Sequence, residues 1–363
     1  MRTRQCWVEQ NPVMAADDLL IERLLRVIDE GRRTATYKLA LLLGLIDAVA
    51  MLPGTSIIPT RVIAERVLEL YFPQTRSYVD RNGVAYMPRQ ISMKSSAVLA
   101  AVERLRLDAE ALRCRTLDEI ARRRPDLYRS TLDAVEDTFV RYPIPLLQTV
   151  GAQVIPFLYE VDWPEGTTVA ALRRRSGDHI RLLDGAADRL VVLGPMLRPL
   201  IEHHWVQDVA RWTGIPTEDE ELHGHLFGRD RVAFPRPLVT SLRELQDDTC
   251  FYCGDRLPAR VEVDHFLPWS RWPNDAIENL VLADRCNGAK SDHLAATGHL
   301  TRWRNRLADH GNELTDIAVR CSWTSSPQRS AALAQTTYRH LAAGTPLWLH
   351  DREFEFATGP SWV

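Results

Sequence analysis

Side chains that could do chemistry gather in one short stretch, between residues 250 and 293. Asp264 and His265 end an apolar run, and Asn279 opens a second one. Asn287 and Lys290 follow in a polar segment. Histidine suits proton transfer near neutral pH, and carboxylate and amide oxygens are ligands that Mg²⁺ accepts. These residue types favour metal-assisted hydrolysis of a phosphodiester bond.

Such hydrolysis requires a base for the attacking water, a hard cation for the developing charge, and a hold on the scissile phosphate. His265 offers the base, while Asp264 and Asn287 offer a carboxylate and an amide oxygen for Mg²⁺ or Mn²⁺. Lys290, one helical turn after Asn287, is the predicted phosphate contact.

The segment from Val263 to Asp292 resembles the HNH domain of the large CRISPR-associated RNA-guided nucleases. The shared residues are Val263-Asp264-His265, Pro268, Ser270, Asn279 and the run Asn287-Gly-x-Lys290-Ser-Asp292. The resemblance implies a ββα-metal finger in which His265 is the general base, and Asp264 and Asn287 hold Mg²⁺. It also implies that Asn279 braces the loop presenting His265. Only this small part of the chain is similar, so use of a guide RNA is not implied.

The layout also resembles stand-alone bacterial HNH proteins with a CxxC before the Asp-His pair, many of which look like restriction or phage-defence nucleases. Zinc-containing members have a second CxxC that ends just before the Asn. Here Cys286 is its second member, but Ala283 stands at the first position. The resemblance therefore implies structural Zn²⁺ on Cys250, Cys253 and Cys286. A closed zinc site has four ligands, so either Asp284 or His293 supplies the fourth or the site is degenerate.

Bulk composition sets broad limits. The 363 residues fit about two or three domains, and the formal net charge of -3 neither supports nor excludes a nucleic-acid partner. No apolar segment follows the first basic residues, so we expect a cytoplasmic protein with reduced thiols, in which CxxC indicates metal. The isolated Cys6, Cys114 and Cys321 are expected to be ordinary thiols. The apolar run 39–52 is too short for a bilayer, which takes about 20 residues, so no membrane partner is expected.

The expected fold class is a mainly α N-terminal domain plus a small α+β ββα-metal domain. We predict a mostly helical recognition or regulatory domain over 1–215, a linker over 216–238 with an acidic run from Thr217, the finger over 239–306, and a C-terminal α/β extension over 307–363. The helical part is either a plain helical domain or includes a helix-turn-helix type unit. The predicted local elements are helices over 57–70 (capped by Thr60), 92–106, 169–175, 197–212 and 331–343, a capping box at Thr116–Glu119, and a strand over 346–350.

The sequence thus predicts a metal-dependent HNH endonuclease that hydrolyses DNA, in restriction or phage defence. Two alternatives stay open: a DNA-binding module with a catalytically silent finger, and a defence effector activated by a ligand or partner protein. One HNH site cuts one strand, so we expect two chains to act together on duplex DNA. The basic runs 122–124 and 173–175 are either phosphate contacts or solvated helix faces.

Overall fold

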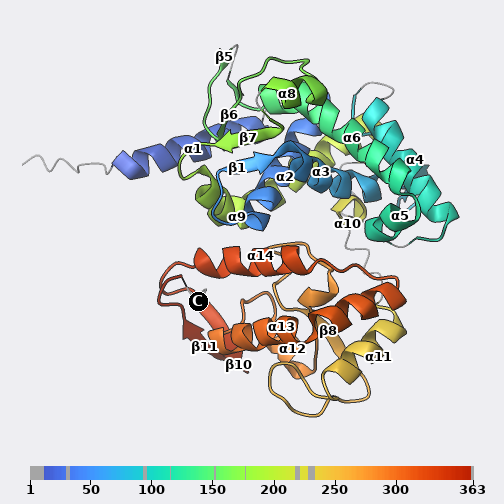
Figure 1. Cartoon of the computed structure of the whole chain (residues 1–363), viewed down its shortest axis with the longest axis vertical. Helices are drawn as coiled ribbons and strands as arrows, with labels where there is room; N and C mark the ends of the chain where they lie inside the picture. Colours follow the sequence, from blue (N-terminus) through green and yellow to red (C-terminus); the bar gives the residue numbers. More distant parts are fainter. Residues whose placement is uncertain are drawn as a thin grey trace, which may run out of the picture.

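The computed structural model describes residues 12–29, 33–92, 96–114, 116–150, 153–175, 177–216, 221–227 and 234–360. They form a mostly helical N-terminal domain, up to residue 227, and a smaller C-terminal domain from residue 234 (Figure 1). This is the predicted fold class. The predictions for Cys6 and for the acidic run at 217–220 lie outside the described residues.

The N-terminal domain is built from helices with a few short strands. Its helices are α1 (Pro12–Asp29), α2 (Tyr37–Met51), α3 (Thr60–Gln74), α4 (Ala97–Ala111), α5 (Leu117–Arg123), α6 (Pro125–Arg141), α7 (Pro143–Leu146), α8 (Val169–Arg175), α9 (Ala186–Thr213) and α10 (Glu221–Phe227). Its strands are β1 (Ile57–Pro59), β2 (Tyr78–Val79), β3 (Ala85–Tyr86), β4 (Thr149–Val150), β5 (Gln153–Val154), β6 (Tyr159–Glu160) and β7 (His179–Leu182). The order β1-β7-β6 forms an antiparallel sheet, and the other strands pair as β2-β3 and β4-β5.

Helix α2 forms the centre of this domain because it is apolar on nearly every side. Its residues from Leu39 to Ile46 are all buried. A helix without a polar face must be covered all round, and α3, α7 and α9 pack against it. Its single acid, Asp47, pairs with Arg198 on α9. Among the described residues, no helix combines the length and the apolar run that crossing a bilayer requires.

The C-terminal domain places two short strands and a short helix on a longer helical scaffold. Its elements are α11 (Arg236–Leu245), β8 (Glu262–His265), the 3-10 helix η1 (Ile277–Asn279), β9 (Leu280–Ala283), α12 (Arg285–Lys290), α13 (Thr297–Arg320), α14 (Pro327–Arg339), β10 (Pro346–His350) and β11 (Glu353–Phe356). Strands β8 and β9 pair antiparallel, and β10 and β11 form a hairpin. The hairpin is tied to the segment after α12 by a bridge between Ala295 and Trp348.

Two predicted boundaries are corrected. The boundary at 306 falls inside α13, so the finger and the predicted extension share one helix. The buried Trp303 of α13 stacks on Phe266 at 5.1 Å between ring centroids, and Arg306 donates to the carbonyls of Glu278 and Leu280. Burial lowers the pKa of Arg306 to about 10. The predicted linker 216–238 contains α10, which packs on α3 and α9 of the N-terminal domain.

Some local predictions hold and others do not. Helix α8 and strand β10 have the predicted bounds, and the Thr116 side chain caps α5 by accepting from the Glu119 backbone N–H. The prediction of a helix from Ile57 with Thr60 as its cap is wrong. Residues 57–59 instead pair with β7, and α3 begins at Thr60 itself. The two isoleucines suit this strand pairing.

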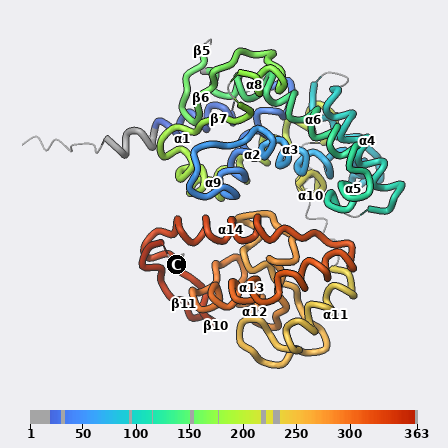
Figure 2. The backbone as a smooth tube through the Cα atoms, viewed as in Figure 1, coloured from blue at the N-terminus to red at the C-terminus, as the bar shows by residue number. Residues whose placement is uncertain are grey.

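Helix α14 lies at the interface between the two domains. It packs against α2 of the N-terminal domain, and Figures 1 and 2 show it on the side of the C-terminal domain that faces that neighbour. Side-chain hydrogen bonds across the interface include Thr324–Asp118 at 2.6 Å, Arg329–Glu69 at 2.9 Å, Thr336–Ala50 O at 2.7 Å and His340–Asp188 at 2.9 Å. A cleft of about 610 Å³ lies at this interface, with walls from α3 to α6 on one side and residues 274–276 and 324–329 on the other.

Candidate active site

The strand pair and the short helix place the predicted catalytic groups along β8, with His265 at its end and Asn287 of α12 beside its first residue, Glu262. Asp264 lies opposite Val281 and His265 opposite Leu280, and α12 follows β9 after one residue. Neighbouring strand residues face opposite sides of a sheet. Asp264 is accordingly buried, whereas His265 on the other face is partly exposed. This β8-β9-α12 unit is the predicted ββα finger.

His265 is held by a carboxylate that the sequence did not reveal as a partner. Its Nε2 lies 2.7 Å from Asp275 Oδ1, and 21% of the side chain is exposed. An ionised carboxylate only accepts hydrogen bonds, so Nε2 carries a proton, and in the neutral imidazole the lone pair is on Nδ1. The rings of Trp269 and Phe234 lie against the imidazole, at 5.3 and 6.2 Å between centroids. Within the described part of the chain, Nδ1 has no protein partner.

Asp264 belongs to a buried polar cluster with Tyr252 and Lys290. The Tyr252 hydroxyl donates to Asp264 Oδ2, and Lys290 Nζ lies 3.0 Å from the same oxygen. Burial, followed by the charge of Asp264, raises the pKa of Tyr252 well above its usual value, so the phenol stays a donor. A carboxylate has about four lone-pair sites, so Asp264 can still accept a further ligand.

The position of Lys290 differs from the prediction of a phosphate contact. Its side chain is only 1% exposed, and its ammonium also donates to the carbonyl of His265 at 2.9 Å. The charge that was expected to face the substrate therefore points inward. Lys290 fastens α12 to both Asp264 and His265.

Replacing Lys290 with methionine is expected to lower the free energy of unfolding by about 3–5 kcal/mol, because Asp264 would stay buried without its cation. Urea denaturation followed by circular dichroism measures this. The matched control is Arg285→Met, because Arg285 on the same helix pairs with Asp255 in solvent and its loss should change stability by at most about 1 kcal/mol. Equal stability of Lys290→Met and wild type, with weaker DNA binding, would restore the phosphate role instead.

Asn287 lies on α12 beside a carboxylate that the sequence analysis missed. Its Nδ2 donates to Glu262 Oε2 at 2.6 Å. Glu262 lies two residues before Asp264, so both acids project from the same face of β8. The alternation of side chains along a strand was the sequence signal that could have identified Glu262 as a neighbour of Asp264. The carboxylates of Glu262 and Asp264 and the amide of Asn287 are oxygen donors of the kind Mg²⁺ and Mn²⁺ prefer.

Asn279 is fully buried and holds the loop that follows His265. Its Oδ1 accepts from the Leu267 N–H at 2.8 Å, and its Nδ2 donates to the carbonyls of Leu267 and Asn274. The backbone continues the link, because Phe266 N–H donates to Asn279 O. One amide side chain thus joins both ends of the segment 267–274.

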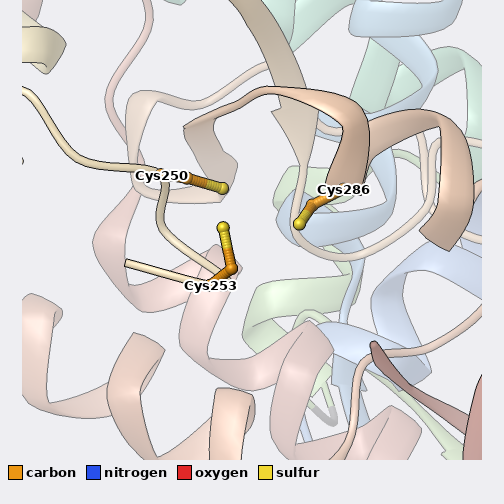
Figure 3. A group of neighbouring side chains, drawn as sticks. All are labelled: Cys250, Cys253 and Cys286. Atoms are coloured by element: carbon orange, nitrogen blue, oxygen red, sulfur yellow. The ribbon is translucent and has the colours of Figure 1, made fainter. Parts of the chain in front are cut away.

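The thiols of Cys250, Cys253 and Cys286 converge at the other end of the β8-β9 pair (Figure 3). Their sulfur atoms all lie within 4.8 Å of one another. A turn after Cys253 needs the left-handed conformation of Gly254, whose φ is +77°, and it brings the Gly254 N–H to Cys250 O. Soft thiolates at this spacing fit Zn²⁺.

The surroundings of the three thiols shift their pKa values in different directions. Burial raises the pKa of Cys250, but backbone N–H groups of Cys253, Asp284 and Tyr252 point at its sulfur, and its pKa is lowered overall. Burial raises the pKa of Cys253 and of Cys286, and neighbouring Cys250 adds to both shifts. Cys250 is therefore the thiol of the three that most readily becomes a thiolate, the form that binds metal.

Neither predicted fourth ligand joins the sulfur cluster. The His293 ring packs edge-on against Phe354, at 4.8 Å between centroids. Asp284 contributes its backbone N–H to Cys250 and is not part of the group of neighbouring ligand atoms. Among the described residues, the cluster therefore offers three protein ligands, with Ala283 where the resemblance places a fourth cysteine.

The basic runs are partly neutralised by neighbouring acids. In the run 122–124, Arg123 pairs with Glu119, and Arg124 pairs with Asp108. In the run 173–175, Arg173 pairs with Asp178 and Glu136. These ion pairs favour solvated helix faces over phosphate contacts for Arg123, Arg124 and Arg173.

Comparison with known families places this site in the HNH endonuclease class. Residues 250–296 match the family model described as HNH endonuclease, which confirms the predicted family. Residues 18–226, more than half of the chain, match a family model described as a domain of unknown function (DUF8808). The chain belongs to the DUF8808 family and carries an HNH endonuclease domain after its family domain. No curated protein and no solved structure matches the chain.

Proposed function

We propose that the protein is a metal-dependent endonuclease that hydrolyses phosphodiester bonds of DNA in the cytoplasm, in restriction or phage defence. The observation that carries the proposal is the position of Lys290, which bonds to both Asp264 and His265 and so holds α12, the helix that carries Asn287, against β8. The defence role is supported by the resemblance to stand-alone bacterial HNH proteins.

In the proposed mechanism, the chain's own residues activate water and provide ligands for a metal ion. His265 accepts the proton of the attacking water at Nδ1, because Nε2 already donates to Asp275. The imidazolium that forms then lies beside the Asp275 carboxylate. Asp264 and Asn287 would hold Mg²⁺ or Mn²⁺, with Glu262 beside them. When bound, this cation stabilises charge on the phosphorane and on the leaving 3′ oxygen.

The proposal is tested by incubating the full chain with supercoiled plasmid in Mg²⁺, in Mn²⁺ and in EDTA. Nicked or linear product that requires the metal supports it. Intact plasmid, linear duplex and single-stranded DNA in both metals would contradict it. Methylated and unmethylated plasmid belong in the same experiment, because restriction depends on that difference.

We further propose that two chains act together on duplex DNA, because one finger hydrolyses one strand. Analytical ultracentrifugation of the protein with a duplex that carries a cleavage site is expected to show two chains per duplex. Cleavage kinetics should then show both strands cut in one binding event. A monomer on the duplex that still breaks both strands in a single step would contradict this.

A further inference from the structure

The loop that carries Asp275 is held in place by a short segment that follows α13. The Trp323 indole N–H donates to Asp275 O at 2.7 Å, and the Ile277 N–H donates to Thr324 O at 3.0 Å. Arg329 Nη2 donates to Pro273 O at 3.3 Å. Residues 323–329 therefore fix the backbone on both sides of Asp275.

The same segment fastens the HNH domain to the N-terminal domain. Thr324 uses its carbonyl for the loop, and its hydroxyl donates to Asp118 at the start of α5. Arg329 uses Nη2 for Pro273 and Nη1 for Glu69 on α3. Both residues thus bond to the N-terminal domain and to the Asp275 loop at once.

The cleft between the domains ends at this loop. Asp275, Thr324 and Arg329 line it from the HNH side, and Glu69 and Asp118 line it from the other. Phe234, the first described residue after the connection between the domains, packs against both His265 and Trp323. The catalytic histidine is thereby linked to the domain interface through hydrogen bonds and through aromatic packing.

We infer that Asp275 is a positioning residue for His265, and that docking of the N-terminal domain through Thr324 and Arg329 sets the position of Asp275. The inference rests on the proposed nuclease function. It assigns the N-terminal domain a regulatory task, in which any change at the cleft that shifts residues 323–329 changes the orientation of the base. The N-terminal domain acts on His265 through bonds to the loop that carries Asp275. Interface contacts elsewhere along α14 should therefore not affect His265.

The positioning role predicts that Asp275→Asn lowers kcat at least about 10-fold with little change in KM. An amide can donate as well as accept, so it no longer fixes the proton on Nε2. NMR of ¹⁵N-labelled histidine, with the His265 signal assigned by its loss in His265→Gln, should show one tautomer in wild type and a mixture or the other tautomer in Asp275→Asn. Asp275→Glu should restore part of both readouts.

The docking role is tested with a matched pair of threonines. Thr324→Val removes the bond to Asp118 and keeps the carbonyl that holds Ile277. Thr336→Val removes a bond of similar length to Ala50 O, on the same interface but away from the loop. We expect Thr324→Val to lower kcat and to alter the His265 NMR signal, and Thr336→Val to do neither, although each removes one interdomain bond.

The outcomes separate this inference from the proposed function. If wild type cuts no DNA in any metal, the proposed function fails, and the NMR of His265 still decides whether Asp275 fixes its tautomer. If wild type cuts DNA and Asp275→Asn keeps both its kcat and a single Nε2–H tautomer, the positioning role is overturned. Equal effects of Thr324→Val and Thr336→Val on kcat and on the NMR signal would overturn the coupling.

Discussion

Replacing His265 with alanine should reduce DNA cleavage by a factor of about 10² to 10⁴, because the variant lacks the group that accepts the proton of the attacking water. The metal ligands and the packing of the finger should survive. The side chain lies at the surface end of β8, and the backbone carbonyl of His265 would still receive Lys290. The loss should therefore appear in kcat, with DNA affinity and thermal stability close to wild type.

Plasmid cleavage by wild type and His265→Ala, side by side in Mg²⁺, Mn²⁺ and EDTA, measures this effect. The control is His310→Ala, which removes an exposed histidine of α13 that pairs only with Glu313 in the described structure. Metal-dependent cutting by His265→Ala at the wild-type rate would contradict the assignment of the base. If neither wild type nor His265→Ala cuts the plasmid, the result would favour a finger that binds DNA without cutting, or a missing activator.

The second large effect concerns the three thiols. Cys250→Ser is expected to abolish zinc binding and to unfold the region around the strand pair, because zinc sites of this kind contribute on the order of 10 kcal/mol to the folding of small domains. Cys250 is buried, like Cys286, and its sulfur receives several backbone N–H groups, so we expect it to anchor the site. Metal analysis and thermal unfolding, with and without a chelator, provide the measurement.

Cys321→Ser is the control for this experiment, since Cys321 follows α13 as an isolated thiol. It should keep both the metal content and the melting temperature of wild type. A companion variant, Ala283→Cys, offers the missing fourth thiolate and should slow the removal of zinc by the chelator. Stoichiometric zinc in Cys250→Ser, or none in wild type, would contradict the three-thiol site.

Residue type and order indicated most of the candidate site because the proposed chemistry needs particular atoms at particular steps along the chain. An Asp-His pair after one apolar run and an Asn before the next already define a strand pair with its loop. The three cysteines were found in the same way. These signals are local, since each depends on neighbours a few residues away.

The burial of Lys290 could not be predicted from local sequence signals. A lysine on a short polar helix is normally exposed, and nothing near it in the sequence shows that Tyr252 and Asp264 will enclose its ammonium. The partner of His265 was hidden for the same reason, because Asp275 stands in a loop whose course is set by Trp323, Thr324 and Arg329. Interactions between distant segments decide both cases, and a single sequence carries no direct record of them.

The predicted boundary at residue 306 differs from the structure because a single helix, α13, belongs to both the finger and the predicted extension. No motif follows residue 306, so the sequence predicts that the finger ends there, whereas α13 continues to Arg320. The fold class itself was predictable, because the apolar run of α2 and the short strands of the finger differ so plainly in length and composition.

The continuity of α13 also limits how this nuclease can be cut out and reused. Its first half carries Trp303 and Arg306 under the finger, and its second half buries Leu314 and Ile317. A graft that stopped at residue 306 would sever this helix, and one that stopped at residue 296 would omit it. Both would lose the hairpin bridged to Ala295. A cutting module transplanted to a new targeting protein must therefore include at least the elements from α11 to β11.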